Sequence, residues 1–283
     1  MEQVFRMNRC CILDLTMKKP TSVFKFETFS AQSIQNLKKQ IIYFAPPRVF
    51  NDPYDCSLPP KVLEPATQEL EAYRDITLKC NNISFAVRND LRNKSIEEIG
   101  AIVKRNAISI FEKRAKFYRE TIGVCCFSQF NNDLLMWAHY GGQYKGFCLE
   151  FNTELPPFTK MTKVKYSDQM PMINAVEALQ NEDYEQFMDL FCTKSKSWSY
   201  ENEWRVFHKE AETQFTYEDA SLKSIYFGPD IDSQSLEIIC LIIQGQNPNV
   251  RFWRGKRSEE KFEVLFDEFK YTSHLDAKSK GHL

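Results

Sequence analysis

Residues 200–205 (YENEWR) carry the residue types best suited to electrostatic and acid–base chemistry. In an extended strand, Glu201 and Glu203 would share one face, and the residues between them the other. Two neighbouring carboxylates let one group orient or deprotonate a nucleophile while the other stabilises positive charge. Lys194 and Arg205 would bind a phosphate or simply neutralise the glutamates. A solvated ion-pair face is the alternative interpretation.

A second candidate is the turn at residues 50–55 (FNDPYD). Asn-Asp-Pro is typical of a turn, which here would present Asn51, Asp52 and Asp55 to a ligand hydroxyl, a metal or a base. In the alternative, Asn51 and Asp52 bond only their own backbone in an Asx-type turn. The residue types leave both interpretations open.

A third candidate is the helix expected at residues 134–140 (LLMWAHY). Trp137 and Tyr140 are three residues apart and share a helix face, where they would form an aromatic wall for a planar ligand. His139 points elsewhere and adds a titratable imidazole. In the alternative, both aromatic rings belong to the core and His139 is a hydrogen-bonded structural residue.

Several common chemistries lack their sequence motif. The chain has no GxGxxG, GxxxxGK[ST] or G-x-S-x-G, and no C-x-x-C or H-E-x-x-H, so these motifs predict neither a classic cofactor fold nor a zinc site. A nucleophile made of Cys125 or Cys126 with His139 can be drawn, but a thiol inside an apolar strand is more often inert.

Composition describes an ordinary globular chain. Of 283 residues, 43% are hydrophobic and 27% charged, and the formal charge of −1 favours neither nucleic acid nor membrane. No apolar run is long enough for a membrane span, and no secretory signal is evident. Nine unevenly spaced Cys are read as reduced thiols, which predicts a cytoplasmic location.

The hydrophobic pattern predicts an α+β fold in which residues 22–272 form a single domain with a mixed, largely antiparallel sheet. A helical insert is expected at about residues 62–118, with a capping box formed by Ser95 and Glu98. Residues 1–21 are interpreted as a leader and residues 273–283 as a flexible tail. Expected strands are 23–26, 41–44, 122–128, 145–151, 163–166, 250–253 and 262–266, and expected helices are 31–39, 65–79, 95–118, 134–140, 175–192 and 233–241.

Short motifs along the chain resemble one bacterial family, the domain of unknown function 2971. The resemblance covers roughly residues 22–230 and implies membership of that family, but the family name supplies no activity. The matching segments, in order, are 23–26 (VFKF), 50–55 (FNDPYD), 126–128 (CFS), 135–140 (LMWAHY), 145–151 (KGFCLEF), 194–198 (KSKSW) and 200–205 (YENEWR).

The order of these motifs is also similar to that of ADP-ribosyltransferases. This weaker likeness implies NAD as the nucleotide and gives Ser128 or Tyr140 the middle role. Glu203 would stabilise the cationic ribose as nicotinamide leaves, and Glu201 would orient the acceptor. Lys25 stands in the early strand, where such enzymes usually have Arg or His.

The expected function is therefore an NAD-dependent ADP-ribosyltransferase-like or NAD-hydrolysing enzyme, as a toxin or phage-defence effector. It would act on a nucleotide-like small molecule, with a protein or nucleic acid as acceptor. The three candidate segments are expected to converge in one cleft. Catalytic roles fall to Glu203, Glu201, Tyr140 and His139, and binding roles to Lys25, Asn51, Asp52, Asp55, Ser128, Trp137 and Arg205.

Two other classes remain open at this point. One is a Mg²⁺-dependent nuclease or phosphodiesterase, in which Lys194 steers phosphate and the metal is held by Asp52, Asp55, Glu150 and Glu201. The other is a non-catalytic module whose Trp-rich surface binds a nucleotide or a protein.

Overall fold

The computed structural model describes residues 18–56, 61–180, 184–279 and 281. The chain folds into two compact units, each considered by itself below. The first unit comprises the described parts of Met1–Pro46, Ile122–Val164 and Lys196–Leu283, and the second comprises those of Pro47–Thr121 and Lys165–Ser195. The expected leader lies outside the described residues except for its last four positions, 18–21.

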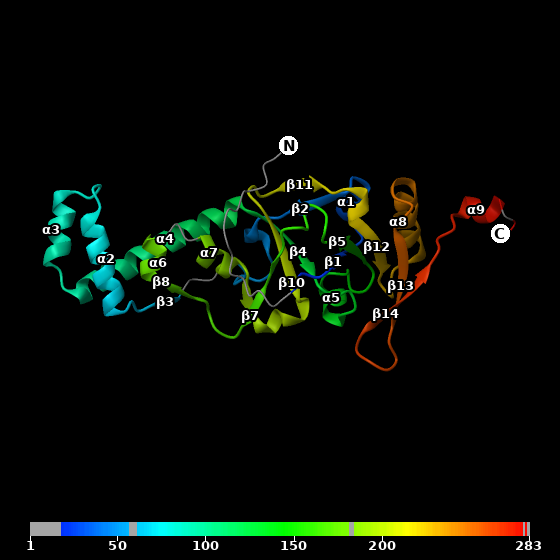
Figure 1. Cartoon of the computed structure of the whole chain (residues 1–283). Coiled ribbons are helices and arrows are strands. Elements are labelled where there is room, and N and C mark those ends of the chain that lie inside the picture. Colours follow the sequence, from blue (N-terminus) through cyan, green and yellow to red (C-terminus); the bar gives the residue numbers. More distant parts are fainter. Residues whose placement is uncertain (1–17, 57–60, 181–183, 280, 282–283) are drawn as a thin grey trace. The chain divides into compact units, whose positions relative to one another are not determined.

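One large sheet organises the first unit, with the strand order β14-β13-β12-β5-β1-β4-β10-β6 among the described residues (Figure 1). β12 and β13 run parallel, whereas the other neighbouring pairs are antiparallel. This confirms the predicted α+β fold with a mixed, largely antiparallel sheet. The strands are β1 (Ser22–Glu27), β4 (Gly123–Ser128), β5 (Phe147–Asn152), β6 (Thr162–Lys163), β10 (Glu203–His208), β12 (Leu222–Phe227), β13 (Arg251–Arg257) and β14 (Val264–Phe269).

Other elements of the first unit pack around this sheet or follow it. A separate antiparallel pair joins β2 (Ile41–Phe44) to β11 (Thr213–Thr216). The helices are α1 (Ala31–Lys38), α5 (Leu134–His139), α8 (Ser233–Gln246) and α9 (His274–Ser279), and the short 3-10 turns are η2 (Lys196–Glu201) and η3 (Asp219–Ser221). α9 lies in the segment expected to be a flexible tail.

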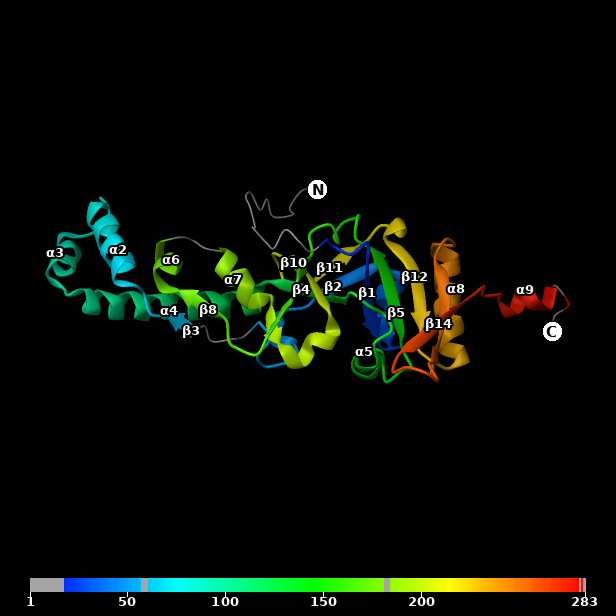
Figure 2. The same ribbon diagram turned by 60° about the horizontal axis from the view of Figure 1, so that its bottom comes forward.

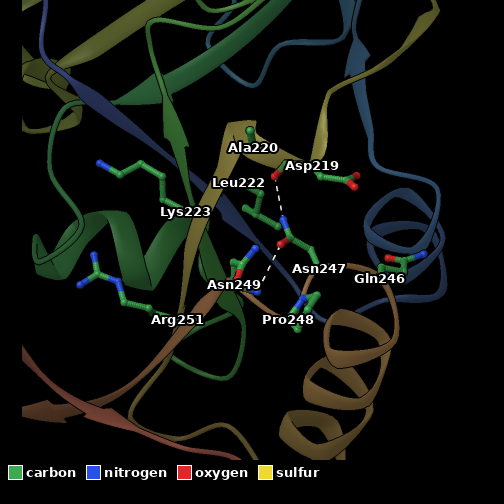
Figure 3. Close-up of a pocket in the computed structure, with 9 residues that line it drawn as sticks. All are labelled: Asp219, Ala220, Leu222, Lys223, Gln246, Asn247, Pro248, Asn249 and Arg251. Atoms are coloured by element: carbon green, nitrogen blue, oxygen red, sulfur yellow. Dashed lines mark hydrogen bonds between the residues drawn. The ribbon is translucent and has the colours of Figure 1, made fainter.

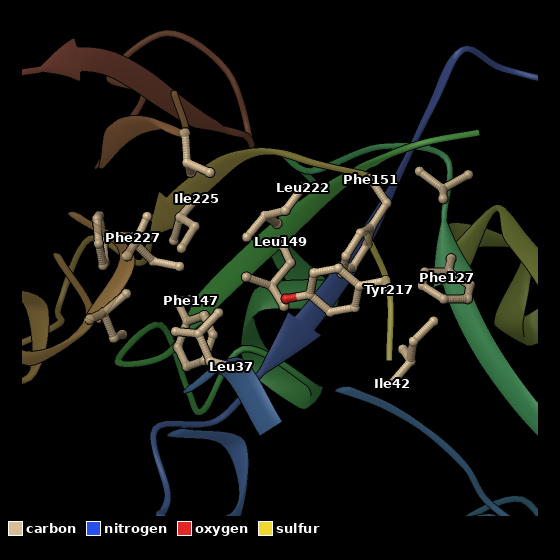
Figure 4. Packing of buried hydrophobic residues seen from close by; sticks show 14 of the residues in the cluster. Leu37, Ile42, Phe127, Phe147, Leu149, Phe151, Tyr217, Leu222, Ile225 and Phe227 are labelled. Atoms are coloured by element: carbon tan, nitrogen blue, oxygen red, sulfur yellow. The ribbon is translucent and has the colours of Figure 1, made fainter. Parts of the chain in front are cut away.

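The core of the first unit lies on one face of the sheet, which α1 and α8 cover (Figures 1 and 2). Leu37 of α1 and Ile239 of α8 belong to the same buried cluster as Phe147 and Phe151 of β5. The Phe151 ring stacks on Phe158 with centroids 4.6 Å apart (Figure 4 shows the cluster around it). Alternation along each strand therefore leaves the intervening residues on the opposite face.

The second unit is mainly helical. Ile99, Val103, Ala107 and Phe111 are buried at four-residue intervals along its longest helix, as expected of an amphipathic helix. The predicted capping box is present: Glu98 accepts from the Ser95 amide at 2.8 Å, and Ser95 Oγ accepts from the Glu98 amide. The elements are η1 (Pro47–Val49), β3 (Lys61–Leu63), α2 (Thr67–Lys79), α3 (Phe85–Asn93), α4 (Ile96–Thr121), β7 (Lys165–Ser167), β8 (Met172–Asn174), α6 (Ala175–Gln180), α7 (Tyr184–Phe191) and β9 (Thr193–Ser195).

Several elements differ from the expected ones. The strand expected at residues 163–166 is divided into β6 and β7, which lie in different sheets, and the expected strands did not include β3, β8, β9, β11 and β12. The single helix predicted at residues 175–192 is divided into α6 and α7, and residues 181–183 between them lie outside the described part of the chain. α3 was not predicted, and none of its residues is buried. Among the described helices, none combines the length and apolarity that crossing a bilayer requires.

Candidate functional site

A row of cross-strand partners crosses the sheet face opposite the α1–α8 core. Glu203 of β10 pairs with Ser128 of β4, Ser128 with Phe24 of β1, and Phe24 with Glu150 of β5. Cross-strand partners project from the same face, so these four residues define what we call the polar sheet face. Three strand spacings place the two glutamate backbones roughly 14 Å apart, which makes them two separate sites rather than one carboxylate pair.

Glu203 and Arg205 form a buried ion pair on the polar sheet face. Arg205 Nε donates to Glu203 Oε1 at 2.7 Å, and Arg205 Nη2 donates to Glu203 Oε2 at 2.9 Å. The Arg205 side chain is fully buried and that of Glu203 is 5% exposed. Residues two apart on a strand share a face, so β10 itself sets this geometry. The two hydrogen bonds hold the carboxylate in one orientation.

Glu201 is not the strand neighbour of Glu203 that the sequence pattern predicts, and this corrects the extended reading of residues 200–205. It is the last residue of η2, and β10 begins only at Glu203. Asn202 between them has φ 44°, a left-handed conformation that Asn adopts more readily than most residues. The chain turns at Asn202, so Glu201 and Glu203 do not project from one extended face. Both are nonetheless buried.

Tyr140 holds Glu201 from the end of α5. Its Oη donates to Glu201 Oε1 at 2.6 Å. Helix α5 begins where Asp133 Oδ1 accepts from the amides of Leu135 and Met136, and Tyr140 is its C-cap. The N-cap and the helix length together fix where the phenol projects. Two segments that are 61 residues apart in the sequence thus meet at a buried carboxylate.

His139 and Tyr200 form the exposed neighbour of this contact. His139 Nδ1 and Tyr200 Oη are 2.9 Å apart, and their rings meet edge to face with centroids 5.8 Å apart. His139 is exposed, whereas Glu201 beside Tyr200 is buried. A solvent-facing imidazole is therefore linked through one phenol to the backbone turn that carries Glu201.

Trp137 is a core residue, which corrects its expected role in stacking on a ligand. Its side chain is fully buried between Phe26 and Phe266, whose ring centroids lie 5.1 Å and 6.0 Å from that of Trp137. The indole Nε1 donates to the Asn131 carbonyl at 2.6 Å. Trp137 and Tyr140 do belong to one packed cluster, as their spacing suggests, but only Tyr140 reaches a site carboxylate.

Ser128 and Lys25 occupy opposite faces. Ser128 is buried beside Glu203, and its Oγ accepts from the Phe130 amide at 3.2 Å. Lys25 alternates with Phe24 along β1 and so leaves the polar sheet face; its Nζ lies 3.4 Å from Glu27. Burial alone would lower the pKa of Lys25, but the Glu27 carboxylate outweighs it and the pKa is raised. Lys25 therefore does not stand beside Ser128 and Glu203.

Glu150 marks a second polar cluster that motif reasoning did not recognise. Its carboxylate accepts from Ser22 Oγ at 2.8 Å and Tyr226 Oη at 3.0 Å, and lies 3.1 Å from Lys223 Nζ. Burial opposes its ionisation, yet the bonds from Ser22 and Lys223 lower its pKa overall. The signal available in the sequence was the carboxylate of Glu150 within an otherwise apolar strand, residues 147–151 (FCLEF).

The Asn-Asp-Pro loop belongs to the second unit. Asp52 Oδ1 accepts from the Tyr54 amide at 2.9 Å. This hydrogen bond forms an Asx-type turn, the alternative interpretation of residues 50–55. Asp55 is buried and lies 3.3 Å from Lys194 Nζ. Asn51 is exposed. Convergence of this loop with Tyr140 and Glu203 stays a prediction.

The described residues give little support to a cysteine nucleophile or to a metal site. Cys125 is buried, and burial raises the pKa of its thiol to about 11, which disfavours the thiolate needed for nucleophilic attack. In the described part of the chain, no three side chains among His, Cys, Asp and Glu gather so that they could hold a metal ion.

Comparison with known proteins bears on part of this region. The family model described as Protein of unknown function (DUF2971) matches residues 136–206, which begin in α5 and end in β10. Searches of curated proteins and of solved structures give no match. The chain is thus similar to that family of unknown function over the segment containing Tyr140, Glu150, Glu201, Glu203 and Arg205.

Proposed function

We propose that the first unit breaks the bond between nicotinamide and ribose in NAD⁺, transferring ADP-ribose to a protein or nucleic-acid acceptor or releasing it by hydrolysis. One observation carries the proposal: two buried carboxylates separated by a single residue are each fixed by a donor. Tyr140 holds Glu201, and Arg205 holds Glu203. Preorganised carboxylates in a dry setting suit a reaction that develops positive charge.

The roles follow from the bond changes. When the C–N bond breaks, its electron pair leaves with nicotinamide, which departs as a neutral molecule, and positive charge develops on the ribose. Glu203, held by Arg205, stabilises that charge. Glu201, oriented by Tyr140, accepts the proton of the water or acceptor hydroxyl whose oxygen bonds to the ribose carbon. Ser128, the cross-strand partner of Glu203, would contact the nucleotide.

The test is NAD⁺ consumption with release of nicotinamide, followed by chromatography. Glu203→Gln is expected to reduce turnover about a hundredfold or more, because it removes the charge aimed at the cationic ribose. Tyr140→Phe, which removes only the hydroxyl, is expected to reduce it about tenfold. Wild-type protein that consumes no NAD⁺, or turnover unchanged in Glu203→Gln, would overturn the proposal.

Matched controls separate chemistry from folding. Glu154→Gln removes an exposed carboxylate, and Tyr43→Phe removes a hydroxyl from a partly exposed tyrosine, both in the first unit. Both are expected to keep wild-type turnover, and thermal unfolding should show that the site variants remain folded. Mg²⁺-dependent cleavage of nucleic acid without NAD⁺ turnover would instead favour a nuclease, and nucleotide binding without turnover a binding module.

An enzyme that consumes NAD⁺ would lower the NAD⁺ content of the cell that makes it. This is the effect expected of a toxin or a phage-defence effector. Expression of the wild-type chain in a bacterial host is expected to reduce NAD⁺ and slow growth, and Glu203→Gln is expected to relieve both effects. Equal growth inhibition by the two chains would separate any toxicity from this chemistry.

A further inference from the structure

A hollow of about 570 Å³ opens where β12 and β13 begin, next to the carboxyl-terminal end of α8 (Figure 3). Its volume falls within the range of small-molecule sites. Lys223 and Arg251 line one part of it, and Asp219 and Gln246 line another. None of these residues takes part in the Glu201–Glu203 chemistry proposed above.

Positive charge is concentrated on one side, where the side chains of Lys223 and Arg251 extend in the same direction (Figure 3). Lys223 Nζ lies 3.1 Å from the Glu150 carboxylate, which partly neutralises its charge. Arg251 is exposed and has no carboxylate partner among the described residues, and its guanidinium lies over the Trp253 ring, 5.4 Å from the centroid. A cation–π contact involves the charge of the guanidinium and does not use its N–H hydrogen-bond donors. The group therefore carries a net positive charge and unused donors.

Hydrogen-bond acceptors are concentrated on the other side. Gln246 Nε2 donates to the Lys38 carbonyl, whereas Gln246 Oε1 is buried without a hydrogen-bond partner among the described atoms. A ligand N–H or O–H that reached this oxygen would supply the missing hydrogen bond. Asp219 adds an exposed carboxylate, and α8 ends at Gln246 with the partial negative charge of a helix C-terminus. Figure 3 shows Asp219 and Gln246 on the side away from Lys223 and Arg251.

We propose that this hollow binds a phosphate monoester that also carries hydroxyl groups, that is, a sugar phosphate or a nucleotide. The phosphate would lie against Arg251 and Lys223, because a guanidinium fork and an ammonium together match a dianion. Hydroxyl groups of the sugar would donate to Asp219 and to Gln246 Oε1. A bare anion would leave the acceptor side unsatisfied, and a neutral sugar would leave the cationic side unsatisfied. The proposal does not depend on NAD⁺ turnover.

The experiment is calorimetric titration of the full chain at low salt with four probes: ribose 5-phosphate, AMP, inorganic phosphate and ribose. The two phosphate monoesters are expected to bind. Arg251→Ala is expected to weaken their binding about tenfold or more. Arg254→Ala is the matched control, because Arg254 is an exposed arginine of the same strand that does not line the hollow. Comparing ribose 5-phosphate with AMP distinguishes a sugar-phosphate site from a nucleotide site.

Asp219→Asn tests the acceptor side without changing its shape. The substitution is expected to lower the affinity for ribose 5-phosphate and AMP and to leave the affinity for inorganic phosphate unchanged. Equal affinity in Arg251→Ala and wild type, no binding of either monoester, or inorganic phosphate binding as tightly as the monoesters would each overturn the proposal. Thermal unfolding of each variant next to Arg254→Ala shows whether a lost signal reflects binding or folding.

Discussion

The large sheet holds its charges in different ways toward its β10 end and toward its β12–β13 end. At the β10 end, Arg205 is fully buried and donates two hydrogen bonds to Glu203. At the β12–β13 end, Lys223 is 36% exposed beside Glu150, and Arg251 is exposed. Charges removed from water must be paired inside the protein, whereas charges at the surface keep the capacity to bind a ligand. The first end thus suits chemistry in a dry site, and the second suits recognition of an anion from solvent.

The largest expected effect is at the buried pair. Arg205→Met leaves Glu203 buried without its guanidinium and is expected to lower the free energy of unfolding by about 3–5 kcal/mol. Urea denaturation of wild type and variant measures this difference. The double variant Arg205→Met/Glu203→Leu is expected to recover most of the loss, because it removes the stranded charge as well. A single-variant loss below about 1 kcal/mol would show that the two ends do not differ.

An intermediate effect is expected at Glu150. Glu150→Gln keeps the shape but removes the charge that accepts from Ser22, Tyr226 and Lys223, and should lower the free energy of unfolding by about 1–3 kcal/mol at pH 7. Because folding lowers the pKa of Glu150 from its ordinary 4.5, its contribution is complete above pH 4.5 and is lost as pH falls through the lower folded pKa. Wild type and variant should therefore converge below that pH in unfolding curves. A constant gap from pH 7 to pH 3 would contradict the assignment.

The smallest effect is expected for an ion pair fully at the surface. Lys256 and Asp267 join β13 and β14 at 2.8 Å, but both side chains are more than half exposed. Lys256→Ala is expected to change the free energy of unfolding by less than about 1 kcal/mol, and by less still at high salt. Parallel urea curves for Lys256→Ala and Arg205→Met measure the contrast directly. A loss at Lys256 as large as that at Arg205 would mean that burial is not what distinguishes the two ends.

Much of the fold was predictable from local pattern. The run at 23–26, the helix at 134–140, and the capping box at Ser95 and Glu98 all appear as predicted. Each depends on periodicity or hydrogen bonds within a few residues. The site was predictable only as a set of candidates. Tyr140 and Glu201 were both named, but their contact was not, and the extended reading of residues 200–205 failed because Asn202 adopts a left-handed conformation.

The sequence alone determined the α+β class, the strands and helices with strong periodicity, and the residue types that carry charge near the site. Only the tertiary structure decided that Trp137 is core, that Arg205 faces Glu203, and that Lys223 meets Ser22 across 201 residues of sequence. Periodicity shows which side of a strand a residue takes, but cross-strand neighbours depend on strand order and register, which packing of the whole sheet sets.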